Sequence, residues 1–264
     1  MRRVCISTVG LLLCLFAGVG LRHVYAQDDL NRLTYNGIGV TFPREWAVNI
    51  SVSLADAPDE ASPVPPMPAA VVFQFIPNVP AENNTPPVIR EVRLYRAADF
   101  GSYPIAAEQL ERLRQLLSAR ADLSPYLQVD LNQPNLTLPY LPGIGATQVM
   151  RAKITYLDGP VIGGIRYLTV YAQDVSPFTA DRVLATFQGL SADGQYVIAA
   201  TFGVRPSVFP EQIDPSADSS NVFDPAVYQT YLSESAAQLH NDTDPSLLRE
   251  IAQLDAVVAS INIQ

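Results

Sequence analysis

Histidine and cysteine, which carry most nucleophilic and acid–base catalysis in proteins, are almost absent from this chain. It has two histidines and two cysteines in 264 residues, and His23, Cys5 and Cys14 all fall within the first 26. A Ser-His-Asp or Cys-His set requires a base beside its nucleophile, and only His240 remains for that role. One histidine without cysteine also cannot fill a typical zinc shell. The composition therefore argues against nucleophilic hydrolases and zinc enzymes, and we expect no cofactor.

His240 is predicted to lie at the end of a helix, where a histidine commonly interacts with the negative end of the helix dipole. No Gly-x-Ser-x-Gly elbow occurs beyond the first 26 residues to supply a matching nucleophile. Lys153 is the only lysine and hence the single candidate for Schiff-base chemistry. We therefore expect His240 to cap its helix or to stand exposed.

Carboxylates are more numerous, and paired carboxylates can hydrolyse glycosidic bonds when their spatial separation is suitable. Four aspartates lie at predicted strand ends or turns: Asp158, Asp174, Asp181 and Asp193. Acids also occupy such positions for turn geometry alone. A hydrolase that uses acids only is therefore an alternative that the sequence leaves open.

A calcium site is a second hypothesis based on oxygen ligands. The loop between Pro210 and Pro225 carries the candidate ligands Asp214, Asp218, Asn221 and Asp224. Their spacing does not match an EF-hand loop, so the alternative is that they are solvated turn and cap residues.

Three arginines are predicted on otherwise apolar strand faces, namely Arg90, Arg96 and Arg166. Such an arginine either pairs with a buried acid or reaches a carboxylate or phosphate of a ligand. Tyr167 and Tyr171 are predicted on the face opposite Arg166, where a tyrosine stripe suits a partner surface or a half-hydrated sheet. These five residues form the candidate ligand-binding set, with structural pairing as the alternative.

The elements that must position these residues are predominantly strands. Period-two patterns predict strands over 33–42 with a turn at Gly37, and over 47–54, 69–76, 88–95, 147–157, 161–173, 183–190 and 195–204. Apolar spacing of three and four predicts helices over 104–120, 225–239 and 245–261. A proline-rich excursion over about 58–87 and a long loop over about 121–146 interrupt the pattern. We predict a single α+β domain, an antiparallel sheet with helices packed against it, spanning residues 27–264.

The first 26 residues have the order of a secretory signal peptide. Arg2 and Arg3 precede an apolar run over 4–20, and Val24-Tyr25-Ala26 closes the segment with a small residue. The apolar run is too short for a convincing membrane span. We predict cleavage after Ala26 and a secreted or extracytoplasmic mature chain, in the periplasm or at the cell exterior, that has no membrane span.

Net charge and cysteine content limit the partners of that mature chain. Removing the segment takes away three arginines and no acid, which lowers the formal net charge from −9 to about −12. Such an acidic protein repels nucleic acid, so we expect no nucleic-acid partner. No cysteine remains to form a disulfide, and stability must come from the core.

Two segments carry a family resemblance. Gly39-Val40-Thr41-Phe42-Pro43-Arg44-Glu45-Trp46 and the closing helix with its Ser260-Ile261 ending resemble PsbP-like domains. The block from Phe187 to Tyr196 resembles uncharacterised exported bacterial proteins. The resemblance implies an α-β-α sandwich around an antiparallel sheet and an exported accessory or binding role. It implies no catalytic residues.

These observations favour an exported, non-enzymatic module that binds a protein partner or a small ligand through its sheet face or its long loops. A hydrolase with paired carboxylates is one alternative, and it predicts two carboxylates close together in a cleft. A structural cell-surface component is the other, and it predicts a filled sheet face without a pocket.

Overall fold

A computed structural model describes residues 30–44, 47, 49–57, 65–76, 88–130, 133, 136–213 and 224–264. The signal segment, Trp46, most of the proline-rich excursion and three of the calcium candidates (Asp214, Asp218 and Asn221) lie outside these residues. Among the described residues, no helix is long and apolar enough to cross a membrane.

The first described elements form the hairpin that the sequence predicts. Strands β1 (Leu30–Tyr35) and β2 (Ile38–Pro43) pair antiparallel across Asn36 and Gly37, whose φ angles are 49° and 78°. Two successive positive φ angles give the turn the twist that a two-residue hairpin requires. Strand β10 (Asn262–Ile263) pairs with the other edge of β2, so the order of this small sheet is β1-β2-β10. No sequence pattern predicts β10, since the predicted closing helix extends to residue 261.

The main sheet has seven antiparallel strands in the order β3-β4-β5-β9-β8-β7-β6. Their bounds are β3 (Asn49–Ala55), β4 (Ala70–Ile76), β5 (Arg90–Arg96), β6 (Thr147–Asp158), β7 (Ile162–Ala172), β8 (Leu184–Ser191) and β9 (Tyr196–Gly203). Every strand predicted within the described residues is present. The α+β class is confirmed.

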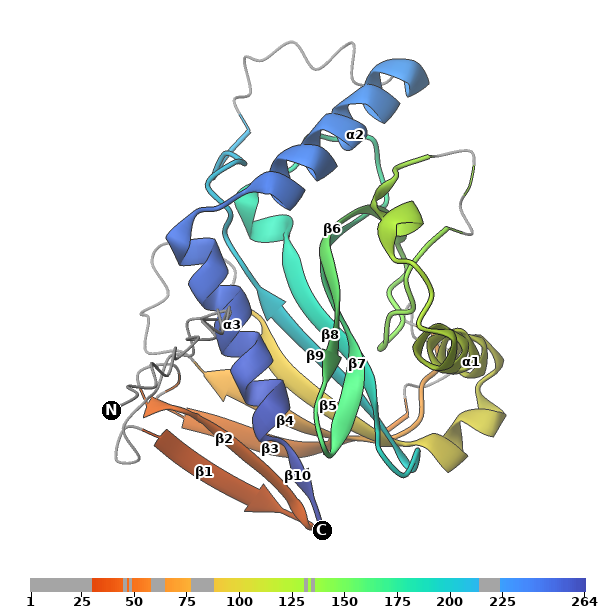
Figure 1. Cartoon of the computed structure of the whole chain (residues 1–264), viewed down its shortest axis with the longest axis vertical. Coiled ribbons are helices and arrows are strands. Elements are labelled where there is room, and N and C mark those ends of the chain that lie inside the picture. The colour runs from red at the N-terminus through yellow and green to blue at the C-terminus, as the bar shows by residue number, and fades with distance from the viewer. Residues whose placement is uncertain are drawn as a thin grey trace, which may run out of the picture.

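Helices cover both faces of the main sheet (Figure 1). Helix α1 (Pro104–Ala119) lies over one face, and α2 (Pro225–Asn241) and α3 (Pro245–Ser260) lie over the other. Short 3-10 turns occur at η3 (Ala97–Ser102), η4 (Ser124–Leu127) and η5 (Ala180–Arg182). Asp224 and Asp244 are the N-caps of α2 and α3, and each carboxylate accepts hydrogen bonds from amides of the first helical turn.

The face covered by α2 and α3 is an apolar core. Phe187 is fully buried there, and its ring lies over a cross-strand pair of glycines, Gly164 and Gly189. A Cβ atom at either glycine would approach the Phe187 ring to 2.5 Å or less, so only glycine fits beneath it. Leu232, in α2, and Leu254, in α3, belong to the same cluster and are fully buried. This face is thus closed by packing.

Candidate functional site

The face of the sheet under α1 is different, because a row of polar side chains crosses it. Gln74, Glu91, Thr201, Thr186 and Tyr167 are successive cross-strand neighbours on five adjacent strands. The last three of them are buried. Buried polar groups must find hydrogen-bond partners, so this face requires a polar cover in addition to an apolar one.

Part of that cover is the segment 136–146, which belongs to the long loop that the sequence predicts. Five hydrogen bonds join it to side chains of the strands: Leu138 N–H to Gln148 Oε1 (2.8 Å), Leu141 N–H to Gln188 Oε1 (2.9 Å), Gln188 Nε2 to the Leu141 carbonyl (3.2 Å), Tyr167 Oη to the Pro139 carbonyl (2.7 Å), and Tyr140 Oη with Thr201 Oγ1 (3.2 Å). Arg112 of α1 also donates to the Thr137 carbonyl and hydroxyl. The loop has no regular structure, yet its backbone groups are paired at fixed points.

The earlier part of the same long loop is held by Arg151 of β6. This side chain is buried and donates to the carbonyls of Tyr126 (2.7 Å), Gln128 (2.6 Å) and Gln148 (3.1 Å). Burial lowers the pKa of its guanidinium. A planar group with several donors can thus hold irregular backbone in place.

Between this loop and the first turns of α1 lies a concavity of about 290 Å³, which we call the groove. Ile105 and Gln109 of α1 form one wall, and Pro65 and Ile144 belong to its lining as well. All the residues that line it are uncharged. The groove therefore offers aromatic, aliphatic and amide groups and no formal charge.

Two tyrosines of the groove pack against each other with tilted rings. The ring centroids of Tyr140 and Tyr171 are 4.8 Å apart at an interplanar angle of 48°, and Gln148 Nε2 donates to Tyr171 Oη at 2.9 Å. Burial raises the pKa of Tyr140 to about 12 and that of Tyr171 well above its ordinary value, so both hydroxyls stay neutral. Hydrogen bonding and ring packing fix this part of the groove before any ligand arrives.

The groove also has exposed apolar side chains. Ile105 is 58% exposed and Ile144 is 37% exposed, and both line it. Single exposed apolar residues are common, but two beside one aromatic concavity form a patch of the kind that binds ligands.

The predicted ligand-binding arginines lie elsewhere. Arg166 forms an ion pair with Asp255 of α3 (3.2 Å) and donates to the Lys153 carbonyl (2.7 Å). It therefore pairs with an acid of the protein, which is the alternative to binding a ligand. Burial raises the pKa of Asp255, and Arg166 opposes that rise. Arg90 is partly buried at the start of β5, where burial lowers its pKa and Glu250 opposes the change.

Arg96 is exposed at the far end of β5 from Arg90. The structure therefore does not gather the five predicted residues into one site. The arginines share the face of α2 and α3, whereas Tyr167 and Tyr171 lie on the face of α1. Of the five, Tyr171 alone lines the groove.

The only lysine and His240 come together at the C-terminal end of α2. Lys153 lies at an irregularity of β6 with φ 47°, and its amide donates to His240 Nδ1 at 3.2 Å. Its ammonium donates to the carbonyls of His240 (3.1 Å) and Asp242, and partial burial lowers its pKa. The exposed His240 interacts with β6 and lines none of the concavities described here. These hydrogen bonds attach the C-terminal end of α2 to β6. The Lys153 ammonium is favourable there because a cation interacts well with the negative end of the helix dipole.

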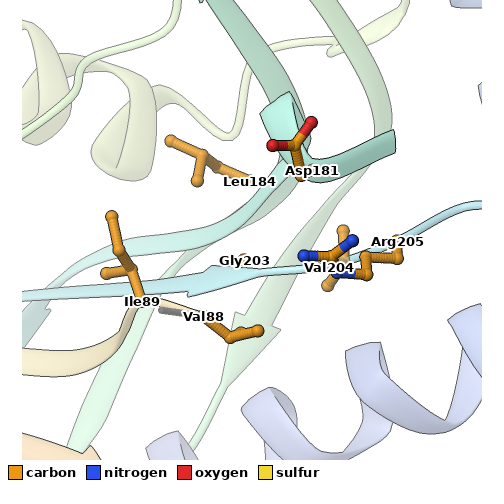
Figure 2. Close-up of a pocket in the computed structure, with 7 residues that line it drawn as sticks. All are labelled: Val88, Ile89, Asp181, Leu184, Gly203, Val204 and Arg205. Carbon is orange, nitrogen blue, oxygen red and sulfur yellow. The ribbon is translucent and has the colours of Figure 1, made fainter. Parts of the chain in front are cut away.

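A second concavity, of about 100 Å³, opens where β9 ends (Figure 2). Val88, Ile89 and Leu184 supply apolar side chains to it, and Asp181 and Arg205 are its charged residues. Arg205 is paired with Glu211 at 2.7 Å. The space holds little more than a few water molecules.

A larger and more open concavity, of about 630 Å³, lies beside the last turn of α1. Arg120 and Asp158 line it and pair with each other. The groove is more enclosed and its tyrosines are held by hydrogen bonds, so it is the better candidate for a ligand site.

The predicted carboxylates have different partners. Asp158 pairs with Arg120, Asp174 accepts from the Ser176 hydroxyl (2.6 Å), and Asp193 accepts from Ser191 (2.5 Å). Each concavity described here is lined by at most one carboxylate. Over the ranges that the structure describes, no three His, Cys, Asp or Glu side chains could hold a metal ion together. Asp224, the calcium candidate within those ranges, caps α2.

Sequence reasoning missed Gln148, Gln188 and Tyr140, which organise the groove. Gln148 and Gln188 are at most 6% exposed although they stand in apolar strands. Their position could have identified them, because a side-chain amide that points into the core from a strand must have a buried hydrogen-bond partner. Tyr140 lies among loop prolines and gave no periodic signal.

No model of a known protein family matches the chain, and no curated protein is similar to it in sequence.

Proposed function

We propose that this protein is an exported, non-catalytic binding module whose ligand occupies the groove between α1 and the loop 136–146. The observation that carries the proposal is an uncharged concavity with fixed tyrosines and two exposed isoleucines. The exported accessory or binding role that the PsbP-like resemblance implies is of the same kind.

The ligand should be neutral and partly apolar. A charged group would lose hydration in the groove without meeting an opposite charge among the lining residues. An apolar ring beside Tyr140 and Ile105 would bury surface worth roughly 25 cal/mol per Å². Because hydrogen bonds already hold the loop, little conformational entropy is lost when a ligand binds.

The two alternatives have less support. A hydrolase of the expected kind needs two carboxylates side by side in one cleft, whereas no carboxylate lines the groove and Asp181 alone lines the concavity at the end of β9. A purely structural component needs a filled surface, whereas the α1 side carries an open, apolar-lined groove.

Isoleucine methyl NMR tests the proposal with phenol and cyclohexanol as neutral probes. In the processed protein, both probes should shift the methyl signals of Ile105 and Ile144 in a saturable way. The methyls of Ile76 and Ile213 are exposed outside the groove and outside the concavity at the end of β9, and they serve as internal controls. Equal shifts at all four isoleucines, or none, would contradict the proposal.

Ile105→Ser provides the matched variant test. It should weaken probe binding at least fivefold, because it removes an apolar group that lines the groove. Leu248→Ser is the control, since Leu248 is 44% exposed in α3 and lines none of the concavities described here. Equal weakening by both variants would mean that the probes bind elsewhere.

A further inference from the structure

We infer that the natural ligand of the groove is an extended, proline-containing segment of a partner polypeptide. The inference rests on the proposed function and names the class of ligand. It is carried by the chain's own proline-rich segment, Pro65-Pro66-Met67-Pro68, which lies in and beside the groove.

Pro65 provides a direct view of a proline in this site. Its ring lies against Gly143 of the loop, and a Cβ atom on Gly143 would be 3.1 Å from both Cβ and Cγ of Pro65. A side chain at position 143 would therefore crowd the proline. The wall of the groove accepts a pyrrolidine ring because glycine stands opposite it.

The residues after Pro65 show how an irregular, proline-rich segment is anchored next to the groove. Residues 65–69 adopt neither helix nor strand, and Met67 is only 4% exposed. Met67 belongs to the cluster of Tyr95, Phe100 and Leu141 under α1. Pro65 thus contacts the groove, while the nearby Met67 side chain enters the core. A partner segment can contact the part of the groove that Pro65 leaves open.

The chemistry of the groove suits a polyproline II segment. Such segments are extended, have no internal hydrogen bonds and dock on aromatic-lined grooves at low entropic cost. Tyr140 and Tyr171 supply the aromatic surface, and Ile105 and Ile144 supply the apolar flanks. Gln109 lines the same groove, and its amide makes no hydrogen bond within the part of the chain that the structure describes, so it is available to a ligand carbonyl.

The size and charge of the groove agree with this class of ligand. A volume of about 290 Å³ lies at the lower end of ligand sites, so it takes one or two residues and not a folded domain. Prolines and small apolar residues bring no charge, as the uncharged lining requires.

The experiment measures fluorescence anisotropy of a labelled hexapeptide, acetyl-Pro-Val-Pro-Pro-Met-Pro-amide, the sequence of residues 63–68. The matched control replaces its four prolines by alanine. We expect the proline peptide to bind the processed protein at least tenfold more tightly than the alanine peptide. Ile105→Ser should weaken its binding at least fivefold, and Leu248→Ser should leave it unchanged.

Three results would overturn the inference, and they are distinguishable from failure of the proposed function. If phenol shifts the groove methyls but the two peptides bind equally, the groove binds ligands but not polyproline segments. If maltotetraose shifts those methyls and the peptide does not bind, the ligand class is a neutral saccharide. If Ile105→Ser binds the peptide as well as the wild type does, the peptide site lies outside the groove.

Discussion

The two faces of the main sheet are closed in opposite ways. Under α2 and α3 the cover is apolar packing, with large side chains such as Phe187 filling space over glycines. Under α1 the cover includes irregular backbone, held by Gln148, Gln188 and Tyr167. Regular helices satisfy their own backbone groups, whereas a buried loop needs partners from elsewhere. The face that supplies those partners is also the face that bears the groove.

The largest expected effect is on the apolar face. Phe187→Ala should reduce the free energy of unfolding by about 3–5 kcal/mol, since it leaves a cavity above two glycines that cannot fill it. Urea unfolding followed by circular dichroism measures the loss. Phe187→Leu, which keeps most of the volume, should lose clearly less. A loss below about 1 kcal/mol for the alanine variant would show that this face is not closed by packing.

A smaller effect, with a different signature, is expected on the polar face. Gln188→Leu leaves the N–H and carbonyl of Leu141 without their partner, and the free energy of unfolding should fall by about 1–3 kcal/mol. Hydrogen exchange at residues 138–146 should accelerate more than exchange in α3. Gln115→Leu is the control, because the Gln115 side chain is exposed and donates to Glu111 of the same helix, α1. Unchanged exchange in the loop would mean that packing alone holds it.

The smallest expected effect is a change of stability with pH, and it comes from the N-cap of α3 on the apolar face. Asp244 caps α3, and hydrogen bonds from Ser246 and Ser207 lower the pKa of its carboxyl to about 2 from 3.8. The stabilisation is therefore fully present above pH 3.8 and is lost as the pH falls through about 2. Asp244→Asn keeps a capping group that does not titrate, so its stability relative to the wild type should rise over that interval.

Thermal unfolding of the two proteins in parallel isolates this contribution. Burial raises the pKa of Glu250 and Asp255, so their ionisation disfavours the fold at higher pH and acidification relieves that cost in both proteins equally. A stability difference that stays constant between pH 5 and pH 2 would contradict the assigned role of Asp244.

The sequence predicts the helices and strands well because their signals are local. Asp224-Pro225 and Asp244-Pro245 mark helix starts, and Asn36-Gly37 and Asp193-Gly194 mark turns. Strand β10 has two residues, and its pairing is fixed only when α3 places it beside β2, so no window of sequence contains its signal.

The candidate site was harder to predict, since distant segments form it. Arg166 was correctly placed opposite Tyr167, but whether it met an acid or a ligand depended on Asp255, 89 residues away. The groove depends on Tyr171, Gln148 and Ile105, which come from a strand end, a strand start and a helix. Periodicity assigns each residue to an element but does not say which elements meet.

The pairing of β10 with β2 determines when, during synthesis, the second edge of β2 is covered. Ser260 Oγ donates to the Thr41 carbonyl and accepts from its amide, both at 2.9 Å, and the Gln264 amide donates to the Gly37 carbonyl at 2.9 Å. A ribosome makes the β1–β2 hairpin well before these partners, because Thr41 and Ser260 are 219 residues apart in the sequence. Until residues 260–264 emerge, one edge of β2 stays uncovered and open to pairing with other chains.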